Sequence, residues 1–130
     1  MADIVSTQVI SDTSGVKYVA KMTNISDGSG ESLVKKIDAS ATTFMTEDGE
    51  RRIAKIWWSV NTTKSNASVE LVWDGETNGT GLLLNGQGYW DLRTAGNSIL
   101  NNAITPTGDV LLSTRDFVVG DNYTILVEFR

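Results

Sequence analysis

The sequence IAKIWWSVNTTKSNASVELVWD, residues 53–74, contains two strand-like segments around which the rest of the chain is organised. In its first half apolar residues recur at every second position, from 54 to 60, so that they share one face of an extended chain. The same period returns at positions 67 to 73, after a polar break, NTTKSN, that is rich in turn formers. We therefore predict two antiparallel strands joined by a loop of about six residues, a hairpin that directs Trp58 and Trp73 into one core.

The neighbouring Trp57 breaks this alternation, and we expect it on the opposite face of its strand. A single amphipathic helix is the alternative for this stretch. It fails because the apolar residues do not recur at intervals of three and four.

Further short segments with strand-like patterns follow one another along the chain, separated by turns rich in Gly, Asn and Asp. In one of them, 33–39, Lys35 interrupts the apolar face and indicates an edge position or a bulge. Residues 93–108 form the longest irregular stretch, and Tyr123 to Phe129 gives the clearest strand. We predict an all-β protein, an antiparallel, jelly-roll-like β-sandwich of about eight or nine strands, with a closed barrel as the second choice.

The 130 residues fit a single domain, 1–130, in which residues 1–10 form either an N-terminal arm or an edge strand. The formal charge of −5 argues against a duplex-binding protein and against an anionic membrane as partner. The start, MADIVST, does not resemble a signal peptide. We expect neither nucleic acid nor membrane as a partner.

The residues that most often carry catalysis are missing: the chain has no His and no Cys. Neither the G-x-S-x-G nor the phosphate-loop pattern occurs. Three acidic, Gly-containing loops, at 27–31, 47–50 and 74–76, lack the spacing that wraps a calcium ion. We therefore expect no enzyme, no cofactor and no metal site; a hydrolase is the third hypothesis for the function.

Trp57, Tyr89 and Trp90 are the candidate partner-contact residues. Exposed aromatic rings on a β-sandwich can stack on sugar rings or anchor a protein partner. Packing in the core or between the sheets remains the alternative for all three, whereas Trp58 and Trp73 continue apolar alternations and are assigned to the core.

The order of five segments resembles a group of small virion structural proteins of tailed bacteriophages, marine and cyanobacterial phages in particular. These segments are TNISDGSGES, VKKIDAS, AKIWWSVNTTKSNASVELVWDG, GQGYWDLR and TGDVLLSTRDFVVGDNYTILVEFR, and they cover nearly the whole chain. None of them is a catalytic signature. The resemblance implies a non-enzymatic particle component, with a capsid decoration (cement) protein as the expected role and a neck, tail or fibre-associated domain as the alternative.

Such a protein would be assembled in the host cytoplasm and would lie on the capsid surface of the virion. Its partners would be the major capsid protein or other virion proteins, and by analogy it would form a homo-oligomer such as a trimer. Residues 1–9 as an arm, or 33–39 as an exposed strand, could pair across subunits by strand addition. A carbohydrate-binding β-sandwich that uses the three candidate aromatic residues is the rival hypothesis from another class.

Overall fold

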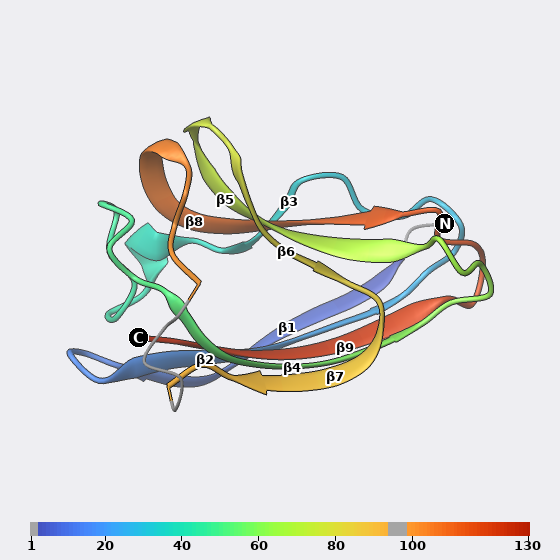
Figure 1. Ribbon diagram of the computed structural model, residues 1–130, viewed down its shortest axis with the longest axis horizontal. Helices are drawn as coiled ribbons and strands as arrows, with labels where there is room; N and C mark the ends of the chain where they lie inside the picture. Colours follow the sequence, from blue (N-terminus) through green and yellow to red (C-terminus); the bar gives the residue numbers. More distant parts are fainter. Residues whose placement is uncertain (1–2, 94–98) are drawn as a thin grey trace.

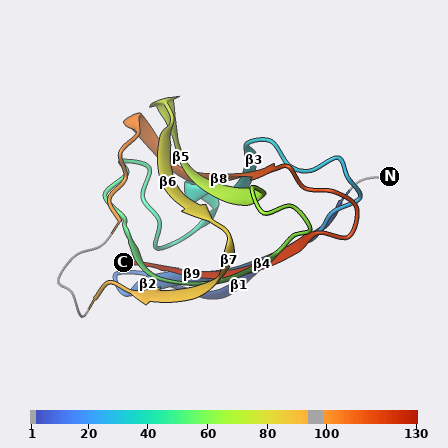
Figure 2. The same cartoon turned by 45° about the vertical axis from the view of Figure 1, so that its right-hand side comes forward.

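The computed structural model describes residues 3–93 and 99–130 and shows two antiparallel sheets packed face to face (Figures 1 and 2). The five-stranded sheet has the order β1-β2-β9-β4-β7, and the four-stranded sheet has the order β3-β8-β5-β6. The strands are β1 (Ile4–Thr13), β2 (Lys17–Ile25), β3 (Val34–Ile37), β4 (Ile53–Asn61), β5 (Ser68–Thr77), β6 (Gly79–Leu84), β7 (Gly86–Asp91), β8 (Ile104–Arg115) and β9 (Asn122–Phe129). One short 3-10 turn, η1 (Ala39–Ala41), follows β3.

The pairing follows a nested pattern that defines a jelly roll. β5 pairs with β6, β4 with β7, β3 with β8 and β2 with β9, so the chain is one long hairpin that wraps into two layers. β1 adds a fifth strand beside β2. The predicted jelly-roll-like β-sandwich is therefore confirmed.

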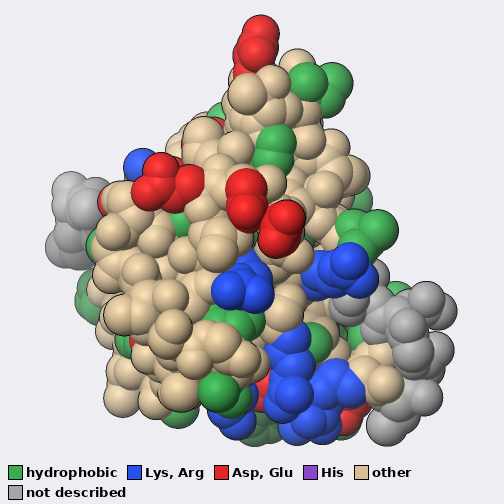
Figure 3. Space-filling view, turned by 90° about the vertical axis from the view of Figure 1, so that its left-hand side faces the viewer, with side chains coloured by type: hydrophobic (Ala, Val, Ile, Leu, Met, Phe, Trp, Pro, Cys, Tyr) green, Lys and Arg blue, Asp and Glu red, His purple; other side chains and the backbone are tan. Residues whose placement is uncertain are grey.

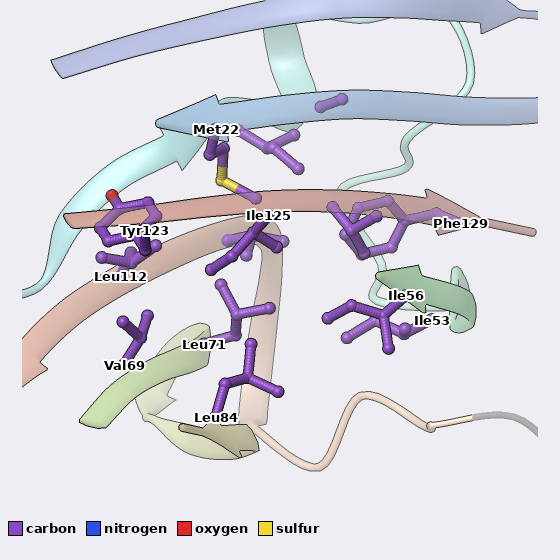
Figure 4. Packing of buried hydrophobic residues seen from close by; sticks show 14 of the residues in the cluster. Met22, Ile53, Ile56, Val69, Leu71, Leu84, Leu112, Tyr123, Ile125 and Phe129 are labelled. Carbon is purple, nitrogen blue, oxygen red and sulfur yellow. The ribbon is translucent and has the colours of Figure 1, made fainter. Parts of the chain in front are cut away.

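The inward faces of the two sheets form one apolar core (Figure 4). Met22, Ile125 and Phe129 project from the five-stranded sheet toward Leu71 and Leu112 of the other layer. Trp73 meets Phe129 across the layers, with ring centroids 5.9 Å apart and the rings edge to face. Burying side chains of this size stabilises the fold by about 1.5–3 kcal/mol each. The expected core position of Trp73 is confirmed, whereas Trp58 faces inward but is only partly buried against the core.

The stretch 53–74 does form two strands, but the predicted hairpin is wrong. β4 belongs to the five-stranded sheet and β5 to the four-stranded sheet, and the two strands do not pair. Their apolar faces pack toward each other across the core, and the loop between the two strands crosses from one layer to the other. Such a loop must span the roughly 10 Å between packed sheets, whereas a tight hairpin turn cannot.

The strand predicted at 33–39 is shorter in the structure, and its two faces were partly misassigned. A register shift between Lys35 and Ile37 marks a bulge, and η1 begins two residues after the end of β3. Lys36 is the extra residue of this bulge, and its side chain is buried. Leu33 lies before β3 with a positive φ of 48° and is exposed. Lys35 lies at the sheet edge and pairs with Asp109, as its interruption of the apolar face indicated.

Residues 93–108 were expected to be irregular, but 104–108 belong to β8, which begins at Ile104 and continues to Arg115. Residues 94–98 of this stretch lie outside the described residues. β6 ends at Leu84 and β7 begins at Gly86, so a very short connection carries the chain from one sheet to the other.

Candidate functional site

The outer face of the five-stranded sheet brings two of the three candidate aromatic residues together. Trp57 on β4 lies directly opposite Tyr89 on the edge strand β7, and both side chains are more than half exposed. Trp57 faces outward because its neighbour Trp58 is directed into the core and successive side chains on a strand alternate. In an antiparallel pair, opposite side chains on one face lie about 5 Å apart, so the two rings form one aromatic surface.

A shallow hollow of about 430 Å³ lies beside this surface and crosses four strands. Val19 of β2 and Leu126 of β9 give it an apolar floor, and the aromatic pair forms one wall. Lys55 and Glu128 supply the charged part of its lining: Val19, Lys55, Trp57, Tyr89, Leu126 and Glu128. We call this the sheet hollow. It is an open surface that can hold a flat, partly apolar ligand.

The two charged groups of the sheet hollow are held by neighbours on the same face. The Lys55 ammonium lies 5.8 Å from the centroid of the Tyr89 ring, within the range of a cation–π interaction. Glu128 accepts a hydrogen bond of 2.9 Å from the Arg130 guanidinium, and Lys17 lies 4.0 Å away on the other side. The carboxylate is therefore shared between cations, and its own negative charge is largely offset at the surface.

A second ion pair borders the hollow at the end of β7. The Arg93 guanidinium donates to both carboxylate oxygens of Asp91, at 2.9 and 2.7 Å. These hydrogen bonds from Arg93 hold the pKa of Asp91 well below its usual range, and burial opposes the shift only in part. Asp91 therefore stays ionised at any physiological pH, with a cation directly over it.

Trp90 does not join the Trp57–Tyr89 pair. It lies opposite Ile56, and so on the inward side of β7, but it remains about half exposed because β7 is the sheet edge. The sequence alone placed the three aromatic residues in one group, and the structure divides them between two faces.

The other lining residues were not singled out from the sequence. Lys55 shares the face of Trp57 because it lies two residues before it, and this spacing could have identified it. Val19, Leu126 and Glu128 come from β2 and β9. Nothing in the local sequence indicates that β9 lies between β2 and β4 and so brings these residues to one face.

Buried polar residues between the layers were also missed. The Glu31 carboxylate accepts hydrogen bonds of 2.6 Å from both the Asn24 amide and the Tyr123 hydroxyl. The Lys36 ammonium lies 2.5 Å from its other oxygen, and the side chains of Glu31 and Lys36 are only 5% and 4% exposed. Burial, together with the hydrogen bond to Glu31, raises the pKa of Tyr123 far above its ordinary value, so its hydroxyl remains a donor. We call these four residues the buried polar cluster; its place between packed strands indicates a structural role.

No cation site emerges from the acidic loops. Asp27 and Asp48 accept hydrogen bonds from residues of their own turns, Ser29 and Glu50 respectively. Within residues 3–93 and 99–130 there is no group of three or more acidic, His or Cys side chains that could hold a metal ion. In the same ranges, no helix has the length and apolar character needed to cross a bilayer.

Comparison of the chain with family models, with curated proteins and with solved structures found no match. The function is therefore inferred from the surfaces of this molecule and the chemistry of its own residues.

Proposed function

We propose that this chain is a non-enzymatic structural protein of a bacteriophage particle, a capsid decoration protein that binds the outer shell and stabilises it. The single observation that carries the proposal is the free edge of β1. A decoration protein needs no chemistry. It needs a compact body with an edge or a surface on which a neighbouring chain can be held.

β1 is an edge strand that lacks most of the usual protection against pairing with another chain. All residues from Ile4 to Ile10 are exposed, among them four large apolar ones. This segment carries no charge and no proline, and only a register shift near Ile10 disturbs its regularity. Natural proteins normally blunt such edges with charged residues, proline or bulges, because the unpaired backbone groups are a template for strand addition.

The strand is held in place at both of its ends, so the edge is formed before any partner arrives. Near its start, Asp3 accepts hydrogen bonds from the Asn24 amide and from the backbone N–H of Asp27. Near its end, Asp12 accepts hydrogen bonds from the backbone N–H groups of Thr43 and Phe44. A preformed strand loses less conformational entropy on pairing than a free arm would.

The partner of this edge would be the major capsid protein, another virion protein or a second copy of the chain. Strand addition supplies backbone hydrogen bonds for affinity, and the exposed Ile and Val side chains supply apolar contact area. β3, the other strand considered for this purpose, has only four residues and carries Lys35 and Lys36, which makes it a poorer edge for pairing.

Two further observations support a particle role. The order of motifs along the chain resembles small virion structural proteins of tailed phages, and the jelly roll is an architecture used by viral capsid domains. The same architecture serves many other functions, so the fold contributes less to the proposal than the edge does. A neck, tail or fibre-associated domain would use the same edge on a different partner.

The experiment is co-sedimentation of the purified protein with DNA-free shells of the phage that encodes it. We expect the wild-type chain to sediment with the shells and Val9→Lys to lose most of this binding, because a buried, unpaired ammonium opposes strand addition. Ser65→Lys adds the same charge in the exposed loop between β4 and β5 and should bind like wild type.

Both variants should unfold at nearly the wild-type urea midpoint, because changes at exposed positions are within about 0.5 kcal/mol. Wild-type protein that stays in the supernatant would reject the decoration role. Equal binding by Val9→Lys would reject β1 as the contact.

A further inference from the structure

The sheet hollow lies on a face whose charge is opposite to that of the whole molecule. The chain has a formal charge of −5, yet the outer face of the five-stranded sheet carries more basic than acidic side chains. Among the described residues, Asp91 and Glu128 are the two acids that the strand register places on this face. The same register places six basic residues there: Lys17, Lys21, Arg52, Lys55, Arg93 and Arg130.

The acids of this face also lie deeper than the bases. The side chains of Glu128 and Asp91 are 10% and 18% exposed, whereas those of Lys17, Arg93 and Arg130 are 37% to 44% exposed. The layer that a ligand meets first is therefore cationic. Figure 3, which looks at the end where β9 finishes, shows Lys and Arg gathered in its lower half, at the five-stranded sheet, and most Asp and Glu above them.

On the side away from this basic end, the same face continues with uncharged hydrogen-bonding groups. The row next to Trp57 and Tyr89 contains Ser59, Gln87 and Thr124, and Asn61 and Asn122 follow it. The Asn61 amide donates to Asn122 at 3.0 Å, so these side chains form an ordered polar surface. Hydroxyl and carboxamide groups can donate and accept, which suits a ligand rich in hydroxyl groups.

We propose that this face binds an acidic glycan, an oligosaccharide that carries carboxylate or sulfate groups. The apolar C–H face of one sugar ring stacks on the Trp57–Tyr89 surface above Val19 and Leu126. Its acidic groups meet the Lys21 and Lys55 ammonium groups and the basic end of the sheet, and its hydroxyl groups meet the uncharged rows.

The alternatives fit the face less well. A neutral glycan would leave the cationic layer without counter-charges. A single-stranded nucleic acid binds by stacking successive bases on aromatic residues placed along its path, and among the described residues of this face Trp57 and Tyr89 are a single cross-strand pair. The proposal is independent of the particle role, because β1 and β7 are opposite edges of the sheet.

The test is titration of the whole protein with oligogalacturonate, oligoalginate and heparin-derived oligosaccharides. Tryptophan fluorescence and calorimetry measure the binding. Methyl-esterified oligogalacturonate is the neutral counterpart, and oligothymidylate is the nucleic-acid probe. We expect binding to at least one acidic glycan, weakened by added salt, and weaker or no binding to the other two probes.

Matched variants locate the site. Trp57→Ala should lower the affinity by about tenfold or more, the effect of truncating a central aromatic contact, whereas Trp90→Ala, on the other side of β7, should stay within about twofold. Lys55→Gln should weaken binding and reduce its salt dependence, and Lys64→Gln, in the β4–β5 loop, should do neither. Circular dichroism verifies that each variant is folded.

Four results would overturn the proposal. They are no binding to any acidic glycan of the panel, equal affinity for the esterified form, tighter binding of oligothymidylate, and an equal loss with Trp90→Ala and Trp57→Ala.

Discussion

Gly88 positions the aromatic surface through its missing side chain. It lies opposite Trp58 on the inward side of the sheet, and a Cβ at this position would overlap the indole ring. The Trp58 indole N–H donates a hydrogen bond of 3.0 Å to the Asn85 carbonyl, which lies directly before β7, so Trp58 helps to hold the edge strand β7 against β4. Tyr89, the next residue, is thereby held beside Trp57.

Gly88→Val should therefore destabilise the protein by about 1–3 kcal/mol, the usual cost of forcing extra volume into a packed site. Urea unfolding followed by circular dichroism measures this change. In a Trp58→Leu background the same substitution should cost clearly less, because the ring that it overlaps is gone. Equal costs in both backgrounds would show that the indole is not the cause.

The buried polar cluster is balanced by the ion pair between Lys36 and Glu31. Lys36→Met leaves the Glu31 carboxylate buried beside only neutral donors, and it should destabilise the fold by about 3–5 kcal/mol. The double variant Lys36→Met/Glu31→Gln removes both charges and should regain much of that loss. Chemical denaturation of the single and double variants tests the coupling, and purely additive effects would contradict it.

Alternation in the sequence was enough to place individual Trp residues, because the pattern is local. Trp57 was expected opposite to Trp58, and the structure has it there. Lys36 could not be placed in this way, because it is the extra residue of the bulge in β3, where the alternation of faces is interrupted. Its partner Glu31 lies in the preceding loop, where no periodic pattern applies.

At the scale of the element, Asp12 connects β1 to the loop that follows η1. Burial acts to raise the pKa of its carboxyl, but hydrogen bonds from Thr43 and Phe44 outweigh it, and the pKa lies below its ordinary value of 3.8. A lowered folded-state pKa contributes stability above the unfolded pKa, and this contribution is lost as the pH falls through the folded value.

Asp12→Asn should therefore reduce the free energy of unfolding at pH 7. Below pH 3.8, where Asp12 of the wild type becomes protonated, the difference in free energy of unfolding between variant and wild type should become smaller. Asp116→Asn, at the exposed residue after β8, serves as the control for loss of one negative charge. Urea midpoints measured from neutral to acidic pH provide the comparison. A gap that is constant over the whole range would show that ionised Asp12 does not hold the loop.

The strands at 53–61 and 68–77 were predictable as elements, but their pairing was not. Each has a clear period of two and a polar break between them, which is also what a hairpin shows. Whether such strands pair or face each other across the core depends on the other strands of the sheets. β4 pairs with β7 and β9, and β9 is far away in the sequence. No local pattern contains this information.

At the scale of the whole molecule, the two proposed surfaces lie on one sheet but do not overlap. β1 offers its backbone edge, and the Trp57–Tyr89 face lies toward the opposite edge, with β2 and β9 between β1 and β4. A substitution in one surface should therefore leave binding at the other surface unchanged. The free-energy effects of substitutions at sites without shared contacts are usually additive.

We expect Val9→Lys to keep the wild-type affinity for an acidic glycan and Trp57→Ala to sediment with shells as wild type does. Calorimetry and sedimentation with the same two protein samples test this. Loss of both activities in either variant would indicate one common surface, or a general defect of the fold.

The candidate site was predictable only in part, because it is a product of the whole topology. The sequence named Trp57 and Tyr89 as candidate partner-contact residues and left core packing open as the alternative, but only the pairing of β7 with β4 makes them neighbours. The basic character of the face could not be read from a sequence with a net negative charge. Its Lys and Arg side chains come from separate strands that lie side by side only in the folded sheet.

A cryo-EM map of the phage particle to which this chain is proposed to belong would test the particle role. We expect repeated density on the exterior of the head that fits the nine-stranded jelly roll, with β1 extended by a strand of the shell protein or of a neighbouring copy. A map in which the head exterior shows no density for this chain would contradict the decoration role.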